Sequence, residues 1–340
     1  MIKYVPTAHE LKIHKSINFN PTTTLYQEIR ALEAIRSKEI VKYYGCVRDN
    51  ARLGIVMEYC NRGNLKEFLM EKNKELNIDN FFDIIINLSN GLNAIHRSGF
   101  VHRDIKSMNI LVNDSPIDKS NERNRYRYKI ADFGTTKRKD EPMTDFILSY
   151  VYQPPEYFNK KKPIKSRNPN KNSLGTSSSL NTMNTSFNSM NTSFNSMNTS
   201  YDLTNTSKST STNSRSTNSG STNSESTNSE STNSESKNTD IASKIDIYSF
   251  GIVMSEILNT ILSGYYDVPY GKVGTNIFKL VEIKKIGAKP SINNCDVKCK
   301  KVHTAKYLYE KCTDIKPKNR PDAQTIGFYV NTALAIYRQG

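Results

Sequence analysis

The sequence is poor in cysteine and has no long apolar segment near its start. Five cysteines lie far apart, and the one closely spaced pair, Cys295 and Cys299, does not have the spacing of a zinc site. An odd and sparse set of cysteines fits a reducing compartment. The first fifteen residues contain no apolar run of the signal-peptide kind, and no segment is predicted to reach membrane-spanning length. We therefore expect a soluble, cytoplasmic protein without a membrane span.

The chain also lacks the alternation of basic and aromatic residues that is typical of nucleic-acid-binding modules. Its formal net charge of +15 over 340 residues is nevertheless compatible with an anionic partner such as nucleic acid or lipid headgroups. Because the basic residues are scattered, we interpret the charge mainly as solubility and general basicity. We expect no nucleic-acid partner. The alternative, a basic protein that binds nucleic acid, rests on net charge alone.

From about residue 160 to residue 240 the sequence lacks the apolar residues that a core needs. This stretch holds two copies of NTSFNSM, at 184–190 and 191–197, and five STNSx pentapeptides from Ser211 to Glu235. Ordering about 80 residues would cost roughly 80–160 kcal/mol of backbone entropy, which its few apolar side chains cannot offset. We predict a disordered Ser/Thr/Asn-rich insert at 160–240, either a tolerated repeat expansion or a segment that is phosphorylated and binds regulators.

A flexible loop of any length closes at modest entropic cost, so the two flanks of the insert can form one domain, 1–159 and 241–340. Two stretches in the first flank have apolar residues at helical spacing. One is 24–37, with Leu25, Ile29, Leu32 and Ile35 on one face, and the other is 81–97, with apolar residues at 81, 85, 88, 92 and 95. Gly99 is a plausible terminator of the second helix. After the insert, residues 243–262 are so apolar that we expect a central helix.

Short strand-like segments surround the most polar part of the chain. Residues 51–60, ARLGIVMEYC, resemble a buried strand, and ILV at 110–112 and YRYKIAD at 126–132 resemble two more. We expect the last two to form a hairpin that presents Asp132 and the polar residues 102–109 into a cleft. Mixed strand and helix followed by a mainly helical region indicates an α+β protein with two lobes.

Five motifs occur in a fixed order in these flanks. They are HRDIKSMN at 102–109, ADFG at 131–134, QPPE at 153–156, DIYSFG at 246–251 and PKNRPDA at 317–323. Together they resemble the protein kinase family, most closely the tyrosine-kinase-like branch of the serine/threonine kinases. The resemblance covers nearly everything except the insert. It implies a small, mostly β N-lobe at 1–61 that lacks its first strand, a catalytic loop and activation segment at 102–156, and a large, mainly helical C-lobe.

The resemblance implies a separate role for each polar residue of the first two motifs. Asp104 is expected to be the catalytic base for the substrate hydroxyl, and Lys106 to reach the γ-phosphate of ATP. Asn109 and Asp132 are expected to hold Mg²⁺, which prefers oxygen ligands. A surface polar residue or a helix cap is the simpler explanation for any one of them, but the ordered set argues against it.

In the small lobe the resemblance places Glu28 at the glutamate of the helix that pairs with an ATP-binding lysine. Lys12, sixteen residues earlier, is the candidate partner, and Lys15 competes with it at a shorter spacing. The surrounding residues imitate the family's strand motif poorly, so a solvated basic strand remains the alternative for Lys12.

Met57 is expected beside the adenine as the gatekeeper, and the backbone of Glu58 and Cys60 is expected to bind the adenine edge. Lys106 after the catalytic acid and Ser149 in the activation segment favour Ser/Thr hydroxyls over tyrosine, because Ser149 occupies the position of the residue that braces Asp104 and Lys106 in serine/threonine kinases.

Three further roles implied by the resemblance are structural. Asp246 is expected to hold the catalytic loop from below, and Glu156 and Arg320 to form a buried ion pair. A hydrophobic stack is expected to align both lobes, and its members are Leu32, Tyr43, His102 and Phe133.

Only eleven residues precede Lys12, which is too few for the family's first strand and its glycine-rich loop over the ATP phosphates. Either the sequence is a fragment or has a misplaced gene start, or it is that of a kinase-like protein that binds nucleotide weakly. Two functional hypotheses follow. The first is a protein serine/threonine kinase whose partners are ATP, Mg²⁺ and a protein substrate, with regulators bound through the insert. The second is a weak or inactive pseudokinase that acts as a scaffold.

Overall fold

The computed structural model describes residues 2–4, 21–49, 52–115, 125–141, 149–159, 232–293 and 298–339. All of these except Thr232 belong to one compact unit. A second unit, residues 10–18 and 163–232, otherwise lies outside the described residues. Two sequence predictions are therefore not addressed by the structure: the role of Lys12 or Lys15, and the disorder of the insert up to residue 231.

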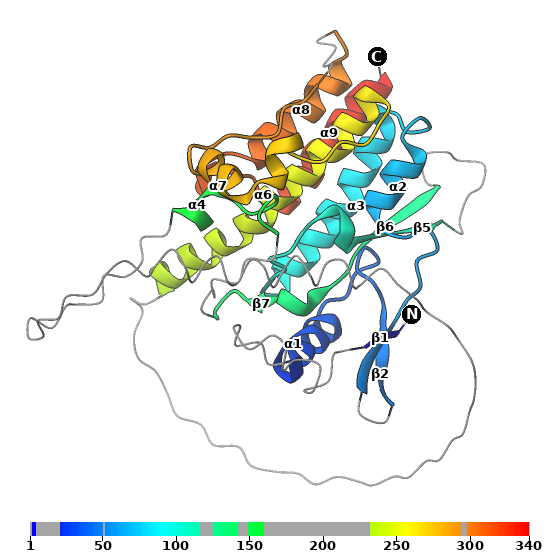
Figure 1. Ribbon diagram of the computed structural model, residues 1–340, viewed down its shortest axis with the longest axis vertical. Helices are drawn as coiled ribbons and strands as arrows, with labels where there is room; N and C mark the ends of the chain where they lie inside the picture. The colour runs from blue at the N-terminus through cyan, green and yellow to red at the C-terminus, as the bar shows by residue number, and fades with distance from the viewer. Residues whose placement is uncertain are drawn as a thin grey trace, which may run out of the picture. The chain divides into compact units, whose positions relative to one another are not determined.

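Within the described residues, the small lobe has a three-stranded antiparallel sheet and one helix (Figure 1). Its strands are β1 (Ile2–Tyr4), β2 (Tyr43–Asp49) and β3 (Arg52–Met57), in the order β1-β3-β2. The helix α1 (Pro21–Ala34) buries Leu25 and Leu32, as the helical spacing predicts. The pairing of β1 with β3 sets Lys3 opposite Ile55, two residues before Met57.

The large lobe is mainly helical, as predicted. Its helices are α2 (Leu65–Lys72), α3 (Ile78–Arg97), α4 (Pro155–Phe158), α6 (Thr232–Ser263), α7 (Ile277–Lys285), α8 (Lys300–Cys312) and α9 (Ala323–Gln339). Two short antiparallel pairs accompany them, β4 (Phe100–Val101) with β7 (Lys137–Arg138), and β5 (Ile110–Asp114) with β6 (Tyr126–Ile130). The second pair is the predicted hairpin, so the α+β prediction is confirmed.

Local sequence explains where α3 begins and ends. Oδ1 of Asn77 accepts hydrogen bonds from the amides of Asp79 and Asn80, and Oδ1 of Asn80 accepts one from the Asn77 amide, which forms a capping box. The residues predicted to face the core, at 81, 85, 88, 92 and 95, are all buried. Gly99, just past the end, has a φ of +80°, a conformation that glycine adopts without a steric penalty. The predicted helix and its terminator are confirmed.

Helix α6 is the central helix that the apolar segment predicts. Its part from Ala242 to Ser263 is long and apolar enough to cross a membrane by length and composition, so the expectation of no such segment was wrong. However, 83% of its most apolar stretch is buried inside the protein, as in the core helix of a folded domain. The helix begins at Thr232 and so includes the last nine residues, 232–240, of the predicted insert.

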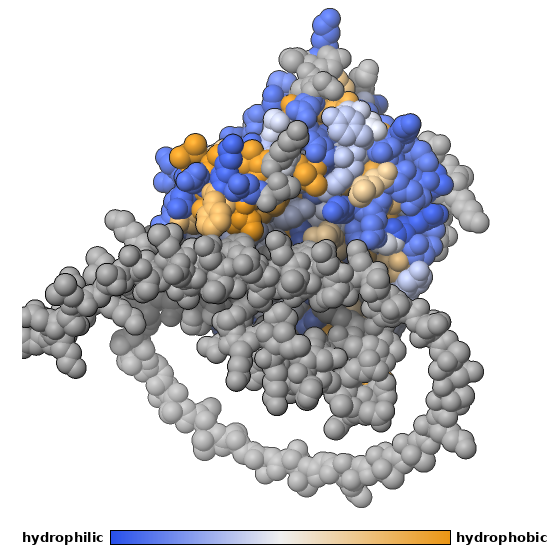
Figure 2. All heavy atoms as spheres, in the orientation of Figure 1, coloured by the Kyte–Doolittle hydropathy of each residue, from blue (hydrophilic) through white to orange (hydrophobic). Residues whose placement is uncertain are grey.

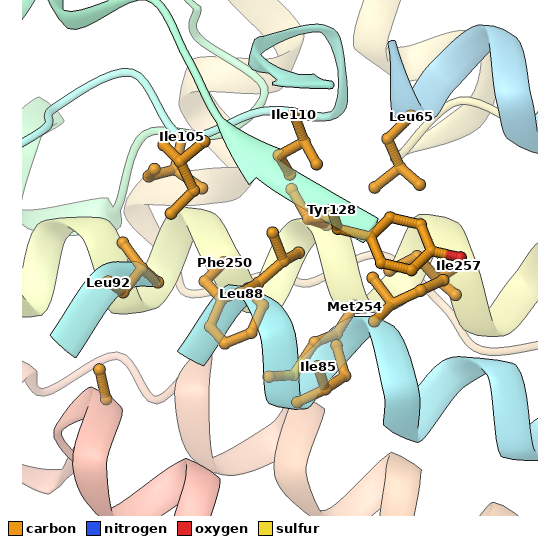
Figure 3. Packing of buried hydrophobic residues seen from close by; sticks show 14 of the residues in the cluster. Leu65, Ile85, Leu88, Leu92, Ile105, Ile110, Tyr128, Phe250, Met254 and Ile257 are labelled. Atoms are coloured by element: carbon orange, nitrogen blue, oxygen red, sulfur yellow. The ribbon is translucent and has the colours of Figure 1, made fainter. Parts of the chain in front are cut away.

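The core lies where α3 and α6 meet the hairpin (Figure 3). Leu88 and Leu92 of α3 and Phe250 and Met254 of α6 are fully or almost fully buried there. Ile105, from the polar motif at 102–109, packs into the same cluster with 2% of its surface exposed. An apolar residue in the middle of the motif therefore fixes the motif to the core.

The visible surface of the large lobe is mostly hydrophilic, and hydrophobic residues gather over the region of α7 (Figure 2). Phe278 and Ile286, in and just after α7, are among the exposed large apolar residues.

Candidate active site

The loop 102–109 is held from below by one buried carboxylate. Asp246 of α6 accepts hydrogen bonds from the amides of His102 (2.8 Å) and Arg103 (2.7 Å), and it contacts Nε2 of His96 at 2.9 Å. Burial acts to raise the pKa of Asp246, but the hydrogen bond and charge of His96 outweigh it, so the pKa lies below its ordinary value. Arg103 has a φ of +72°, which costs about 1–2 kcal/mol in a residue with a side chain. The two amide bonds to Asp246 maintain this turn, so Asp246 has the expected contacts.

His102 connects the loop to the ADFG motif. It is fully buried, and burial lowers the pKa of its imidazole, which favours the neutral form. Nε2 lies 3.0 Å from the carbonyl oxygen of Ala131, so Nε2 carries the proton and donates it. The imidazole meets the ring of Phe133 edge to face, with centroids 4.9 Å apart. Two members of the predicted hydrophobic stack are therefore in contact.

Asp104 is the centre of a compact polar cluster. Its Oδ2 accepts hydrogen bonds from Lys106 Nζ at 2.6 Å and from Asn109 Nδ2 at 2.9 Å. Asn109 Nδ2 also donates to the main-chain oxygen of Asp104 at 2.9 Å. The other carboxylate oxygen, Oδ1, is buried and has no partner among the described residues. The cluster therefore orients a carboxylate with one oxygen left to accept a hydroxyl proton.

Asn109 and Asp132 carry oxygen atoms of the kind that a divalent cation takes. Since the amide nitrogen of Asn109 is bound to Asp104, its amide oxygen is the atom left for another ligand. Asp132 follows β6 with a φ of +64°, and its half-buried side chain acts electrostatically on His102. An amide oxygen and a carboxylate are the donor types that Mg²⁺ takes from proteins.

Residues of the segment that precedes α4 close the other side of the cluster. Lys106 Nζ donates a hydrogen bond to Ser149 Oγ at 3.2 Å while it contacts Asp104. Thr135 Oγ1, after the ADFG turn, donates to the carbonyl of His102 at 2.9 Å. The structure thus brings Ser149, Lys106 and Asp104 together, as the motif comparison predicts.

The predicted ion pair between Glu156 and Arg320 is present. Nη1 and Nη2 of Arg320 bind the two carboxylate oxygens of Glu156 at 2.7 and 2.8 Å, and the Arg320 side chain is completely buried. A bidentate pair of this kind fixes direction as well as distance. It fastens α4, and with it the QPPE segment, to the large lobe.

Met57, Glu58 and Cys60 lie at the end of β3, where the chain leaves the small lobe. The amide of Glu58 is bound to the carbonyl of Lys42 at 2.8 Å, and its carboxylate forms an ion pair with Lys129 at 2.9 Å. Within the described ranges, no hydrogen bond uses the carbonyl of Glu58 or the amide of Cys60. These are the backbone groups that the sequence analysis expects to bind the adenine edge.

Glu28 lies in α1 and is 2% exposed, in agreement with a role inside the small lobe. Among the described residues one lysine precedes α1, and its pairing with Glu28 is a hypothesis that the comparison of variants in the Discussion tests. Lys3 lies in β1, the strand that pairs with β3, whereas Lys12 lies outside the described residues. A three-residue strand at the start of the sequence carries almost no periodic signal, but the dipeptide Ile2-Lys3 was the available clue.

A second group that sequence reasoning missed lies directly beneath the catalytic loop. Oε1 of Glu256, in α6, accepts hydrogen bonds from the hydroxyls of Ser107 (3.1 Å), Tyr152 (2.9 Å) and Tyr266 (2.6 Å). Burial raises the pKa of Glu256 to about 7, although these three hydrogen bonds act to lower it. Ser107 belongs to the motif 102–109 and Tyr152 immediately precedes QPPE, so one carboxyl joins both segments to α6.

An oriented carboxylate, a lysine bound to it and two oxygen donors for a cation define a phosphotransferase site. The protein kinase domain family matches residues 2–229, which is well over half of the chain. The chain belongs to the protein kinase family and has its two-lobed fold.

Individual relatives agree with this assignment. Serine/threonine-protein kinase pakG of Dictyostelium discoideum is 31% identical over 129 residues, 38% of this chain and 10% of that protein. A protein of the same organism named "Probable tyrosine-protein kinase" is 24% identical over 338 residues, 96% of this chain and 73% of that protein. Mitogen-activated protein kinase kinase kinase dlk-1 of Caenorhabditis briggsae is 32% identical over 143 residues, 41% of this chain and 15% of that protein. The chain therefore spans only a small part of the length of two of these three relatives.

Proposed function

We propose that the protein is an ATP- and Mg²⁺-dependent protein kinase that phosphorylates serine and threonine hydroxyls. One observation carries this proposal. Asp104 has one carboxylate oxygen bound to Lys106 and Asn109, while the other is buried and unpartnered among the described residues. An unpaired buried carboxylate oxygen is unfavourable unless a ligand supplies a donor, and a substrate hydroxyl supplies one.

Each residue of the site would have a separate role in phosphoryl transfer. Asp104 Oδ1 accepts the hydrogen bond of the substrate hydroxyl, which orients the attacking oxygen and takes its proton. Lys106, whose ammonium lies 2.6 Å from Asp104 Oδ2, supplies positive charge next to the transferring phosphoryl group. Asn109 and Asp132 would hold Mg²⁺, which neutralises phosphate charge when it is bound. The backbone of Glu58 and Cys60 and the side chain of Met57 would bind the adenine.

The preference for serine and threonine is the finer part of the proposal. Ser149 receives a hydrogen bond from Lys106, so the segment that precedes α4 is bound close to the catalytic carboxylate. This contact is the one that the resemblance to serine/threonine kinases implies for Lys106 and Ser149, so it supports serine and threonine hydroxyls as the acceptors. The names of the relatives include both specificities, so product analysis must decide between them.

The test is transfer of labelled γ-phosphate to a generic basic protein with Mg²⁺, followed by phosphoamino-acid analysis. We expect phosphoserine and phosphothreonine from the wild type and none from Asp104→Asn. Phosphotyrosine as the main product would contradict the specificity. Equal label in both proteins, or none in either while the protein remains folded, would contradict the enzymatic proposal and favour the scaffold. The cytoplasmic location expected from the sequence remains part of the proposal, and fractionation of cells tests it.

A further inference from the structure

A lysine is completely buried beneath the QPPE segment. Lys284, in the last turn of α7, has none of its surface exposed, whereas its neighbour Lys285 is exposed. Lysine is almost never fully buried without a compensating partner, because its ammonium loses its hydration. Neither the motif comparison nor the phosphotransfer chemistry assigns a role to Lys284, so its burial requires another explanation.

The contacts of Lys284 point to the QPPE segment. Its Nζ donates a hydrogen bond of 2.6 Å to the main-chain oxygen of Gln153. Three aromatic rings surround the same nitrogen, those of Tyr270 at 5.0 Å, Tyr248 at 5.1 Å and Phe158 at 6.0 Å from their centroids. Burial lowers the pKa of Lys284 well below its ordinary value, while the charge of Glu156 acts in the opposite direction. Both the amine and the ammonium carry an N–H, so the hydrogen bond does not depend on the charge.

Gln153 continues the connection toward the catalytic loop. Its side chain is 2% exposed, and Nε2 donates a hydrogen bond of 3.3 Å to the main-chain oxygen of Arg103. Arg103 directly precedes Asp104 and has the left-handed conformation that the loop needs. Two hydrogen bonds therefore lead from α7, through one residue, to the peptide group next to the catalytic carboxylate.

We propose that Lys284 is a positioning residue that fixes Gln153 and, through it, the backbone that orients Asp104. This inference rests on the proposed kinase function. It gives α7 a role in catalysis, although no atom of α7 belongs to the reacting groups. A displacement of a catalytic group by a fraction of an ångström is enough to reduce phosphoryl transfer.

The test compares Lys284→Met with Lys285→Met. Methionine has nearly the shape of the lysine side chain and suits an aromatic environment, so Lys284→Met should fold and lose only the donor to Gln153. We expect kcat to fall about five- to tenfold with an unchanged KM for ATP, because the nucleotide contacts are not altered. Lys285→Met makes the same substitution in the same helix at an exposed position, and it should behave like the wild type.

A second variant cuts the connection without touching Lys284. Gln153→Ala removes the donor to the main-chain oxygen of Arg103. It also removes an amide oxygen that is buried and has no partner among the described residues, and because that oxygen is unfavourable, the net loss of stability should be small. It should lower kcat about as much as Lys284→Met, and the double variant should lower it no further than the larger single effect. Additive effects would show that the two residues act separately and would overturn the inference.

Hydrogen–deuterium exchange of residues 102–109 separates this inference from the proposed function. Faster exchange in Lys284→Met and Gln153→Ala, but not in Lys285→Met, is expected whether or not the wild type transfers phosphate. Unchanged exchange and unchanged kcat in Lys284→Met would refute the positioning role. A wild type without any transfer would refute the kinase proposal alone.

Discussion

Replacement of Arg320 by methionine tests how the QPPE segment is held to the large lobe. All five N–H groups of this buried guanidinium have acceptors: both Glu156 oxygens and the carbonyls of Lys244, Asp314 and Ile315. The guanidinium also lies 4.9 Å from the ring of Tyr248. The variant leaves a partly buried carboxylate and buried carbonyls without donors. Removal of one partner of a buried pair costs about 3–5 kcal/mol.

A loss of this size corresponds to a fall in Tm of roughly 6–20 °C, at about 2–4 °C per kcal/mol for a domain of this size. Denaturant unfolding and thermal melting of the purified protein measure both quantities. Arg36→Met is the matched control, since Arg36 is exposed and its loss should change stability by no more than about 0.5 kcal/mol. A loss below about 1 kcal/mol in Arg320→Met would refute the reasoning, because it would mean that the pair adds nothing beyond its own desolvation.

Three further predictions follow from single positions. Because burial raises the pKa of Glu256 from 4.5 to about 7, the free energy of unfolding should fall by about 3 kcal/mol as pH rises from 4.5 through 7. Glu256→Gln should remove this pH dependence in unfolding curves, and the same pH dependence in both proteins would contradict the prediction. A Cβ at Gly251 would lie 2.6 Å from Thr313 Cγ2, so Gly251→Ala should lower the free energy of unfolding by about 1–3 kcal/mol in denaturant unfolding. A gain in stability would contradict the close packing of Gly251 against Thr313. Lys3→Met should weaken ATP binding in calorimetry more than Lys12→Met, and the reverse order would return the role to Lys12.

Much of the large lobe could be predicted from the sequence because its signals are local. The apolar residues of α3 repeat with the helical period, and Asn77 and Gly99 mark its two ends. The hairpin β5–β6 follows from two short apolar segments with polar ends. Asp104, Lys106 and Asn109 lie within six residues, so the chain itself brings them together, and a fold that orders the loop creates the cluster.

What the sequence did not reveal depends on contacts between distant segments. In the sequence, Glu256 looks like any other polar residue of a central helix. Only the fold brings it into contact with Ser107, which lies 149 positions earlier in the chain. Lys284 stands in a lysine-rich helix end, and nothing in the local pattern separates it from the exposed Lys285. The start of α6 at Thr232 was missed because its first residues repeat a polar pentapeptide. Once the apolar part of a helix has formed, each further turn adds backbone hydrogen bonds without a new nucleation cost.

Phosphoryl transfer by the wild type and by Asp104→Asn, measured under single-turnover conditions, tests the central claim most directly. Asparagine preserves the size of the side chain and an acceptor for Lys106, but it cannot take the proton of a substrate hydroxyl. We expect both proteins to have the same thermal shift with Mg²⁺ and ATP, and only the wild type to transfer label to serine and threonine. Equal transfer by the two folded proteins would contradict the role of Asp104 and with it the account of this site.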